Sequence, residues 1–312
     1  MALGYYPLSL DCVEVSTFPD IALYVKQGAN YILYKNRGVR LTNGDVKRLQ
    51  ANRVEYVHVS SENADIVRTY LEKNIVGILS DNSLSHKSKN SILCPVLMNY
   101  VSDIFKDPQK NEPLDKCRSL LRYLADNLAD REELMGLLSN LAMYNAYLVI
   151  HSAQVAILSM YVHKTFFNLF SDELLDVGIG GILHDIGMTR VAGDILEKAD
   201  TLSKHEYYRV RHHTRYSHDI LVKMGIKEPI PLTIALSHHE RYNGTGYPNR
   251  LYEKEIPRSA LVAGMCDVYC ALTTDRPYRA ASTPEAAIKT MTGEKRLFHP
   301  EMFADFCNLM TA

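Results

Sequence analysis

The spacing of hydrophobic residues changes near residue 90, and this change constrains the fold more than any other feature of the sequence. Before it, short runs rich in β-branched and aromatic residues alternate with turn signals such as Asn36-Arg37-Gly38. Strands are expected over 21–25, 31–34 and 54–59, and helices over 43–49 and 63–73. Beyond residue 92, apolar residues recur every three or four positions, as in helices that bury one face. The sequence therefore predicts a small α+β part followed by an all-α part.

Leucines mark the first helices of the all-α part. They stand at 120, 121, 124 and 128, and again at 134, 137, 138 and 141. Further helices are expected over 172–183, 204–224, 230–239, 259–272 and 284–291, the last with a start signal at Thr283-Pro284-Glu285. The polar stretch Ser80–Asn90 is expected to be a linker. We therefore expect a multidomain chain with a regulatory α+β domain over 1–80, a linker and connecting helices over 81–140, and a functional domain over 141–312.

Composition limits the partners and the compartment. Lys and Arg number 35 against 36 Asp and Glu, so a broad electrostatic contact with long nucleic acid is not expected. The six cysteines form no CxxC pair and no secretory signal opens the chain, which favours reduced thiols and a cytoplasmic protein. The apolar segment Leu141–Val162 carries Asn145, His151 and Gln154, so we expect a buried core helix and no membrane span.

Five places in the helical part offer side chains that ligate metals. They are His151, the pair His184-Asp185, His213, the pair His238-His239, and Asp267. Imidazole and carboxylate ligands suit iron, manganese, zinc and similar ions without selecting one of them. Each place alone has an ordinary explanation, such as a hydrogen-bonded core histidine, a helix cap or a surface pair.

The order and spacing of these residues resembles the HD-GYP family, a branch of the HD phosphohydrolases. The resemblance runs from about Tyr147 to Phe306, roughly half of the chain. It includes Leu183-His184-Asp185-Ile186-Gly187, the string from His238 to Pro248 (HHERYNGTGYP), and the string from Asp275 to Arg279 (DRPYR). The last two strings are specific, and they occur in the family's order.

The resemblance implies an HD-type helical bundle that holds two divalent transition-metal ions, iron first, with manganese or zinc as alternatives. One ion would be held by His151, His184, Asp185 and Asp267, and the other by His213, His238 and His239. Asp185 would bridge both ions and serve as the catalytic residue. The residues implied to contact a cyclic dinucleotide are Gly244, Gly246, Tyr247, Arg276 and Arg279. Tyr147 stands where some relatives have a glutamate that binds a third metal, which favours a binuclear centre.

Several positions depart from the family pattern. The usual lysine after His-Asp-x-Gly is Met188, and a thioether can neither bind a phosphate as a cation nor donate a proton. The other departures are Tyr242, Asn243, Leu261, Cys270 and His299.

Three functions therefore remain open. The first is hydrolysis of cyclic di-GMP or a related cyclic dinucleotide, which the intact ligands favour. The second is a dinucleotide receptor that cleaves weakly or not at all and signals through its N-terminal domain or a protein partner, which Met188 favours. The third is a helical domain that metals only stabilise; the retained tyrosine and arginines disfavour it.

Overall fold

The computed structural model describes residues 4–82, 84–142, 147–169, 171–196, 198, 200–275 and 279–311. The chain forms two compact units, Met1–Asn99 and Tyr100–Ala312. Each unit is described by itself.

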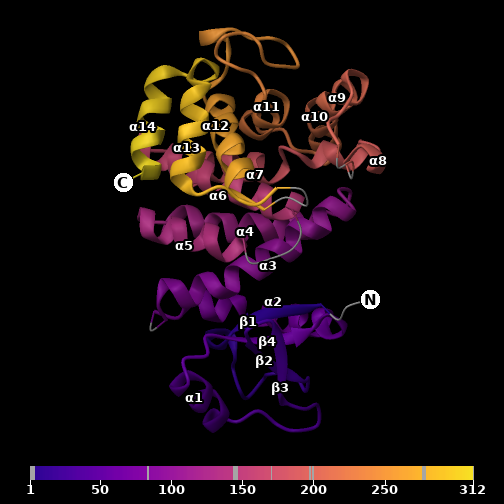
Figure 1. Ribbon diagram of the computed structural model, residues 1–312, viewed down its shortest axis with the longest axis vertical. Coiled ribbons are helices and arrows are strands. Elements are labelled where there is room, and N and C mark those ends of the chain that lie inside the picture. The colour runs from indigo at the N-terminus through magenta and orange to yellow at the C-terminus, as the bar shows by residue number, and fades with distance from the viewer. Residues whose placement is uncertain are drawn as a thin grey trace. The chain divides into compact units, whose positions relative to one another are not determined.

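The first unit contains a four-stranded antiparallel sheet (Figure 1). The strands are β1 (Tyr5–Ser9), β2 (Leu23–Gln27), β3 (Asn30–Lys35) and β4 (Tyr56–Ser60), in the order β1-β4-β2-β3. The three strands expected from the sequence are confirmed, and β1 is an addition. Its Pro7 argues against a central strand, but β1 lies at the edge of the sheet, where proline is tolerated.

Helix α1 (Asn43–Ala51) begins at a capping box. The Thr42 hydroxyl accepts a hydrogen bond from the backbone N–H of Asp45, and the Asp45 carboxylate accepts from the N–H of Thr42. The same carboxylate also binds Lys35 and Arg48. The expected short helix is therefore confirmed, and its start is fixed by local hydrogen bonds.

The boundaries of α2 (Ala64–Ser80) and α3 (His86–Lys106) correct the expected linker. A linker was expected over Ser80–Asn90, but residues 86–90 belong to α3. The hydroxyl of Ser85 accepts from the N–H of Ser88 at 3.1 Å, which caps the new helix. The serines that suggested a loop thus include a helix start signal.

The second unit is all-α in its described residues, as expected. Its helices are α4 (Asn111–Asn127), α5 (Arg131–Leu141), α6 (Tyr147–Phe167), α7 (Ser171–Leu183), α8 (Gly193–Leu196), α9 (Lys204–Arg211), α10 (His213–Lys223), α11 (Pro229–Ser237), α12 (Arg258–Thr273), α13 (Pro284–Gly293) and α14 (Pro300–Thr311). Short 3-10 turns include η3 (Ile186–Arg190), directly after the His184-Asp185 pair.

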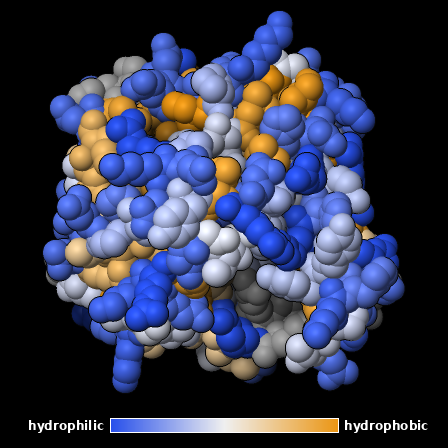
Figure 2. Space-filling view, turned by 90° about the horizontal axis from the view of Figure 1, so that it is seen from above, coloured by the Kyte–Doolittle hydropathy of each residue, from blue (hydrophilic) through white to orange (hydrophobic). Residues whose placement is uncertain are grey.

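Helices α6 and α7 form the centre of this unit. Helix α6 packs against α5, α7 and α12, and α7 also packs against α4 and α11 (Figure 1). A Cβ atom at Gly181 would lie 2.4 Å from the Cα of Ala156, so the backbones of α6 and α7 touch there. As expected, α6 is a buried core helix. Throughout the described chain, no helix combines the length and the hydrophobicity needed to cross a bilayer. The face seen in Figure 2 is mainly hydrophilic, with hydrophobic residues in separate groups.

Two expected helices have different limits. The helix predicted over 204–224 is interrupted at His212, so it forms α9 and α10. At this break the imidazole Nδ1 of His213 bonds to the carbonyl oxygen of Val210, and His213 becomes buried. The helix predicted to include His239 ends at Ser237. Both interruptions place histidines at helix ends, where their side chains are not confined to one helical face.

Candidate metal centre

The seven side chains expected to bind metal lie together inside the second unit. His151 comes from the first turns of α6, and the pair His184-Asp185 follows α7. His213 begins α10, His238 and His239 follow α11, and Asp267 lies in α12. Segments that are far apart in the sequence therefore converge on one place.

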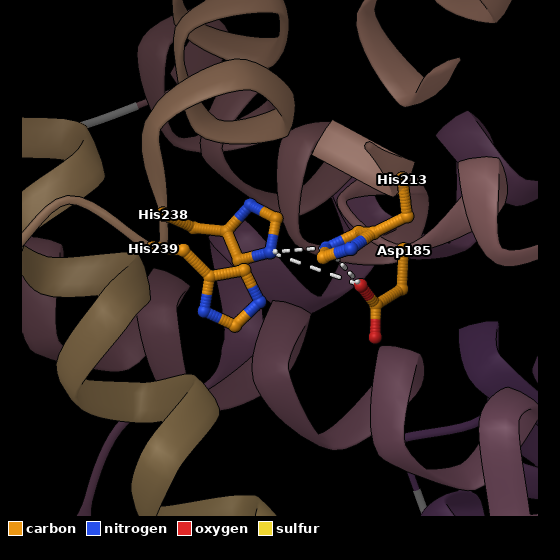
Figure 3. Close-up of side chains that lie close together, drawn as sticks. All are labelled: Asp185, His213, His238 and His239. Carbon is orange, nitrogen blue, oxygen red and sulfur yellow. Dashed lines mark hydrogen bonds and ion pairs between the residues drawn. The ribbon is translucent and has the colours of Figure 1, made fainter. Parts of the chain in front are cut away.

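Asp185 lies at the middle of this set. Its Oδ1 is 3.1 Å from Nε2 of His213 and 3.7 Å from Nε2 of His238 (Figure 3). Its Oδ2 is 3.5 Å from Nε2 of His184 and 4.0 Å from Nε2 of His151. The ligand atoms thus fall into two groups that share Asp185: one with His213, His238 and His239, and the other with His151 and His184. One carboxylate with an oxygen toward each group has the geometry of a bridging ligand.

Three of the histidines are oriented by backbone carbonyl groups. Nδ1 of His184 donates to the carbonyl of Gly181 at 2.7 Å, and Nδ1 of His213 to that of Val210 at 2.7 Å. Nδ1 of His238 donates to the carbonyl of Ile234 at 2.9 Å. A carbonyl oxygen can only accept, so each of these Nδ1 atoms carries the proton. In a neutral ring the Nε2 atom then presents a lone pair to the centre, the arrangement usual for metal-binding histidines.

Two of these Nε2 atoms lie close together. Nε2 of His213 lies 3.3 Å from Nε2 of His238 (Figure 3). Nε2 of His184 and Oδ1 of Asp185 are buried and have no hydrogen-bond partner among the described residues. A buried cluster of acceptors is costly unless something positive lies among them. The residues present therefore fit divalent cations.

Burial and neighbouring charges set the protonation of the cluster. Burial and the neighbouring imidazoles lower the pKa of His238 to about 3, against the opposing effect of the neighbouring carboxylates. Burial also holds the pKa of His239 well below its ordinary value. For Asp185 and Asp267 burial acts in the opposite direction, but the surrounding imidazoles hold the pKa of each carboxyl group below its ordinary value. Although burial acts in the opposite direction, the contact with Asp185 raises the pKa of His213 above its ordinary value. Neutral His238 and His239 beside two carboxylates are in the protonation states that metal binding requires.

The remaining two histidines lie beside Asp267. Nε2 of His151 lies 3.0 Å from Oδ1 of Asp267, and its Nδ1 is buried without a hydrogen-bond partner in the described residues. Nδ1 of His239 lies 3.8 Å from Oδ2 of Asp267. Asp267 therefore contacts a histidine of each group, whereas the family resemblance implied that it binds the first ion alone.

The loop after His239 is attached to the centre by Glu240. This carboxylate is buried and accepts hydrogen bonds from the backbone N–H groups of Asn249, at 2.7 Å, and Leu251, at 3.0 Å. A Cβ atom at Gly246 would lie 2.5 Å from the Cα of Glu240, so only glycine fits there. Sequence reasoning gave Glu240 no role, although a carboxylate directly after two ligands and before a glycine-rich turn is a usable signal.

Tyr247 is held against the metal ligands by this loop. Its ring stacks on the ring of His239, with centroids 4.6 Å apart, and its N–H donates to the carbonyl of His239. Burial raises the pKa of the Tyr247 hydroxyl above its ordinary value. The hydroxyl thus stays protonated and can donate a hydrogen bond to an anion near the centre. Gly244 has a φ of 73°, a backbone conformation that favours glycine.

Of the two arginines expected to contact a ligand, only Arg279 belongs to the described residues. Arg276 lies outside the described residues. Arg279 is exposed, and its guanidinium donates to the carbonyl oxygen of Ala271.

Most departures from the family pattern have local partners. The side-chain oxygen of Asn243 accepts hydrogen bonds from the N–H and the hydroxyl of Thr245, and these bonds stabilise the turn. The rings of Tyr242 and His299 pack edge to face, 5.1 Å apart. Cys270 is buried, and burial raises the pKa of its thiol well above the ordinary value, so it packs as a neutral residue. Met188 lies in η3, three residues after Asp185, at the position where the family pattern has a lysine.

Comparison with known families agrees with this geometry. A sequence profile described as HD domain matches residues 136–302, more than half of the chain. The chain belongs to the HD-domain family. The expected fold, an HD-type helical bundle preceded by a small α+β part, is thereby confirmed.

The HD-domain chain is similar to several curated phosphodiesterases. It is 28% identical over 218 residues to the cyclic di-GMP phosphodiesterase PA4108 of Pseudomonas aeruginosa, covering 69% of this chain and 52% of that protein. A cyclic di-GMP phosphodiesterase of Thermotoga maritima is 36% identical over 133 residues, which are 41% of this chain and 35% of the relative. A 3'3'-cGAMP-specific phosphodiesterase of Vibrio cholerae is 32% identical over 161 residues, 51% of this chain and 34% of the relative. This chain therefore spans from about a third to about half of the length of these relatives.

A solved structure also shares the HD-domain fold. The HDG"Y"P protein of Bdellovibrio bacteriovorus superposes with a TM-score of 0.69 at 19% sequence identity, covering 99% of this chain and 100% of that one. The resemblance to the HD-GYP family is confirmed by these relatives together.

Proposed function

We propose that this chain is a metal-dependent phosphodiesterase that hydrolyses cyclic di-GMP or a related cyclic dinucleotide at a centre of two transition-metal ions, iron in the first place. The observation that carries the proposal is the pair of ligand groups joined by Asp185. The relatives named as cyclic di-GMP and 3'3'-cGAMP phosphodiesterases support this substrate class.

Different residues of the chain would bind the metal ions and the dinucleotide. The five histidines and Asp267 would hold the ions, and Asp185 would bridge them. Two bound cations would supply Lewis acidity for the scissile phosphate and for the attacking water. Tyr247 would donate its hydroxyl proton to a phosphate oxygen, while Arg276 and Arg279 would contact the dinucleotide as cations. Burial keeps the imidazoles of His238 and His239 neutral and free to bind metal.

One observation favours a second function. Met188 provides neither a positive charge nor a proton three residues after Asp185. A protein with intact ligands but a weak phosphate contact would bind the dinucleotide and release it uncut. It would then act as a receptor that signals through its N-terminal domain or through a protein partner.

The test uses the full chain, prepared anaerobically and loaded with iron or manganese. Metal content is measured by mass spectrometry, and cyclic di-GMP, 3'3'-cGAMP and cyclic di-AMP are incubated with the protein and separated by chromatography. We expect about two ions per chain and opening of at least one dinucleotide ring. Asp185→Asn should abolish both, whereas Asp219→Asn, an exposed carboxylate of α10, should not. Binding without ring opening would favour the receptor, and absence of binding would contradict both functions.

A further inference from the structure

Arg211, an arginine that the sequence analysis did not single out, lies beside Tyr247. The guanidinium carbon of Arg211 is 4.5 Å from the centroid of the Tyr247 ring and 6.0 Å from that of Tyr207. Tyr247 itself stacks on the metal-site residue His239. Arg211 thus lies one aromatic ring beyond the metal ligands.

The charge of Arg211 is not neutralised in the described part of the chain. No carboxylate there lies within 4.0 Å of its guanidinium, and no hydrogen bond from it to a described residue is formed. Two other arginines near the centre do form hydrogen bonds within the chain. Arg241 donates to the carbonyls of His238 and Glu240, and Arg215 donates to the side chain of Asn249. A half-buried guanidinium whose N–H groups have no acceptor among the described residues is available to bind an anionic ligand beside the candidate metal centre.

The position of Arg211 suits one group in particular. A guanidinium that lies on an aromatic ring still has its N–H edge available, and this edge matches two oxygens of a phosphate. A cyclic dinucleotide has two phosphodiester groups, and the metal centre would bind only the one that is cleaved. The second phosphate needs a partner outside the metal ligands.

We propose that Arg211 is a substrate-contacting residue that binds the phosphate that is not cleaved, and thereby selects cyclic dinucleotides over simple phosphodiesters. The inference rests on the proposed function, because it names a determinant of that substrate class. It also gives Tyr247 a second task, since its ring supports Arg211 as well as covering His239.

Arg209 provides a matched control. It lies on the same helix, but two helical positions correspond to about 200° of rotation, so it faces away from Arg211. Arg209 is exposed and lines a separate shallow cavity of about 250 Å³ with Arg190, Tyr208 and His212. Arg209→Gln therefore removes the same charge from the same helix without touching Tyr247.

The experiment compares Arg211→Gln, Arg211→Lys and Arg209→Gln in the metal-loaded full chain, after each is shown to contain the wild-type amount of metal. The substrates are cyclic di-GMP, with two phosphates, and bis(p-nitrophenyl) phosphate, with one. For Arg211→Gln we expect the preference for cyclic di-GMP, as the ratio of kcat/KM values, to fall at least about 10-fold, mainly through KM. Arg211→Lys should lie between Arg211→Gln and the wild type, and Arg209→Gln should match the wild type. If the wild type binds without cleaving, the dissociation constant for cyclic di-GMP replaces kcat/KM.

Two results would overturn the inference while leaving the proposed function intact. They are an unchanged preference in Arg211→Gln, and an equal loss for both substrates, which would make Arg211 a support for the metal ligands only. A wild type that cleaves bis(p-nitrophenyl) phosphate but neither binds nor cleaves any cyclic dinucleotide would overturn both.

Discussion

The imidazole Nε2 of His151 lies 3.0 Å from the carboxylate of Asp267, although 116 residues separate the two in the sequence. This contact joins α6 to α12. It places the first and the last of the expected ligands side by side.

Replacement of Asp267 should weaken metal binding without removing it entirely. Asp267→Asn keeps the shape of the side chain but removes the negative charge that His151 and His239 face. We expect the metal content to fall below that of the wild type, and that of Asp185→Asn to fall further because Asp185 belongs to both ligand groups. Metal analysis after gel filtration measures this order, and equal metal content in both variants would contradict it.

Replacement of Met188 should raise turnover if the missing lysine limits it. Met188→Lys adds a cation three residues after Asp185, where it can approach a bound phosphate. Thr189→Lys adds the same charge one residue further along, at an exposed position, and serves as control. We expect faster release of linear dinucleotide from Met188→Lys only. Identical rates in both variants would show that this charge does not limit the reaction.

Glu240 should control the order of the loop that carries Tyr247. Glu240→Gln retains one acceptor oxygen but turns an amide group toward a backbone N–H, which leaves a buried donor unpaired. The expected cost is about 1–3 kcal/mol of unfolding free energy. Hydrogen exchange at the amides of Asn249 and Leu251 should accelerate, and KM for the dinucleotide should rise. Glu301→Gln, an exposed glutamate of α14, should change neither.

Gly187 should be indispensable for placing His213. A Cβ atom at Gly187 would lie 2.1 Å from the carbonyl oxygen of His213 and 2.5 Å from the N–H nitrogen of Ser217. Gly187→Ala must therefore push η3 away from α10, at an expected cost of about 1–3 kcal/mol together with loss of metal. Thermal unfolding and metal analysis test this. Gly193→Ala, where no atom lies within 4 Å of the new Cβ, is the control.

His163 should make the protein less stable in acid. Burial and the nearby Arg258 lower its pKa from 6.5 to about 4, although its hydrogen bond to the carbonyl of Ser159 acts in the opposite direction. As the pH falls from about 6.5 to about 4, His163 becomes protonated in the unfolded chain but stays neutral in the folded chain. The free energy of unfolding therefore decreases in this range. The contribution is at most about 3 kcal/mol. Unfolding of His163→Asn should depend less on pH in this window than unfolding of the wild type, and parallel curves would contradict the assignment.

The sequence predicted the nature of the elements better than their ends. The apolar runs within 141–162 and 259–272 identify α6 and α12, because apolar runs of this length favour helices. Periodicity could not locate the break at His212, because residues 204–224 keep a helical pattern across it. The break depends on a hydrogen bond from the His213 ring to Val210, which a pattern of hydrophobic residues does not encode.

In the candidate site, too, sequence motifs predicted some residues, whereas others could be recognised only from their contacts in the folded chain. His184, Asp185, His238 and His239 were expected from ordered motifs, and the structure brings them together with the other ligands. Arg211 and Glu240 act through contacts with Tyr247 and with loop amides, and such contacts require the folded loop. Their types alone, an arginine and a glutamate in a polar region, are common on any protein surface.

The carbonyl contacts that orient three of the histidines have a consequence for how the centre assembles during folding. Each links an imidazole to a carbonyl group only three or four residues earlier, so it can form as soon as its own helix end forms, within microseconds. His213 and His238 are separated by only 25 residues, whereas the contact between His151 and Asp267 must close a long loop. A newly made chain is therefore expected to form the His213–His238 side of the centre before α6 and α12 have met.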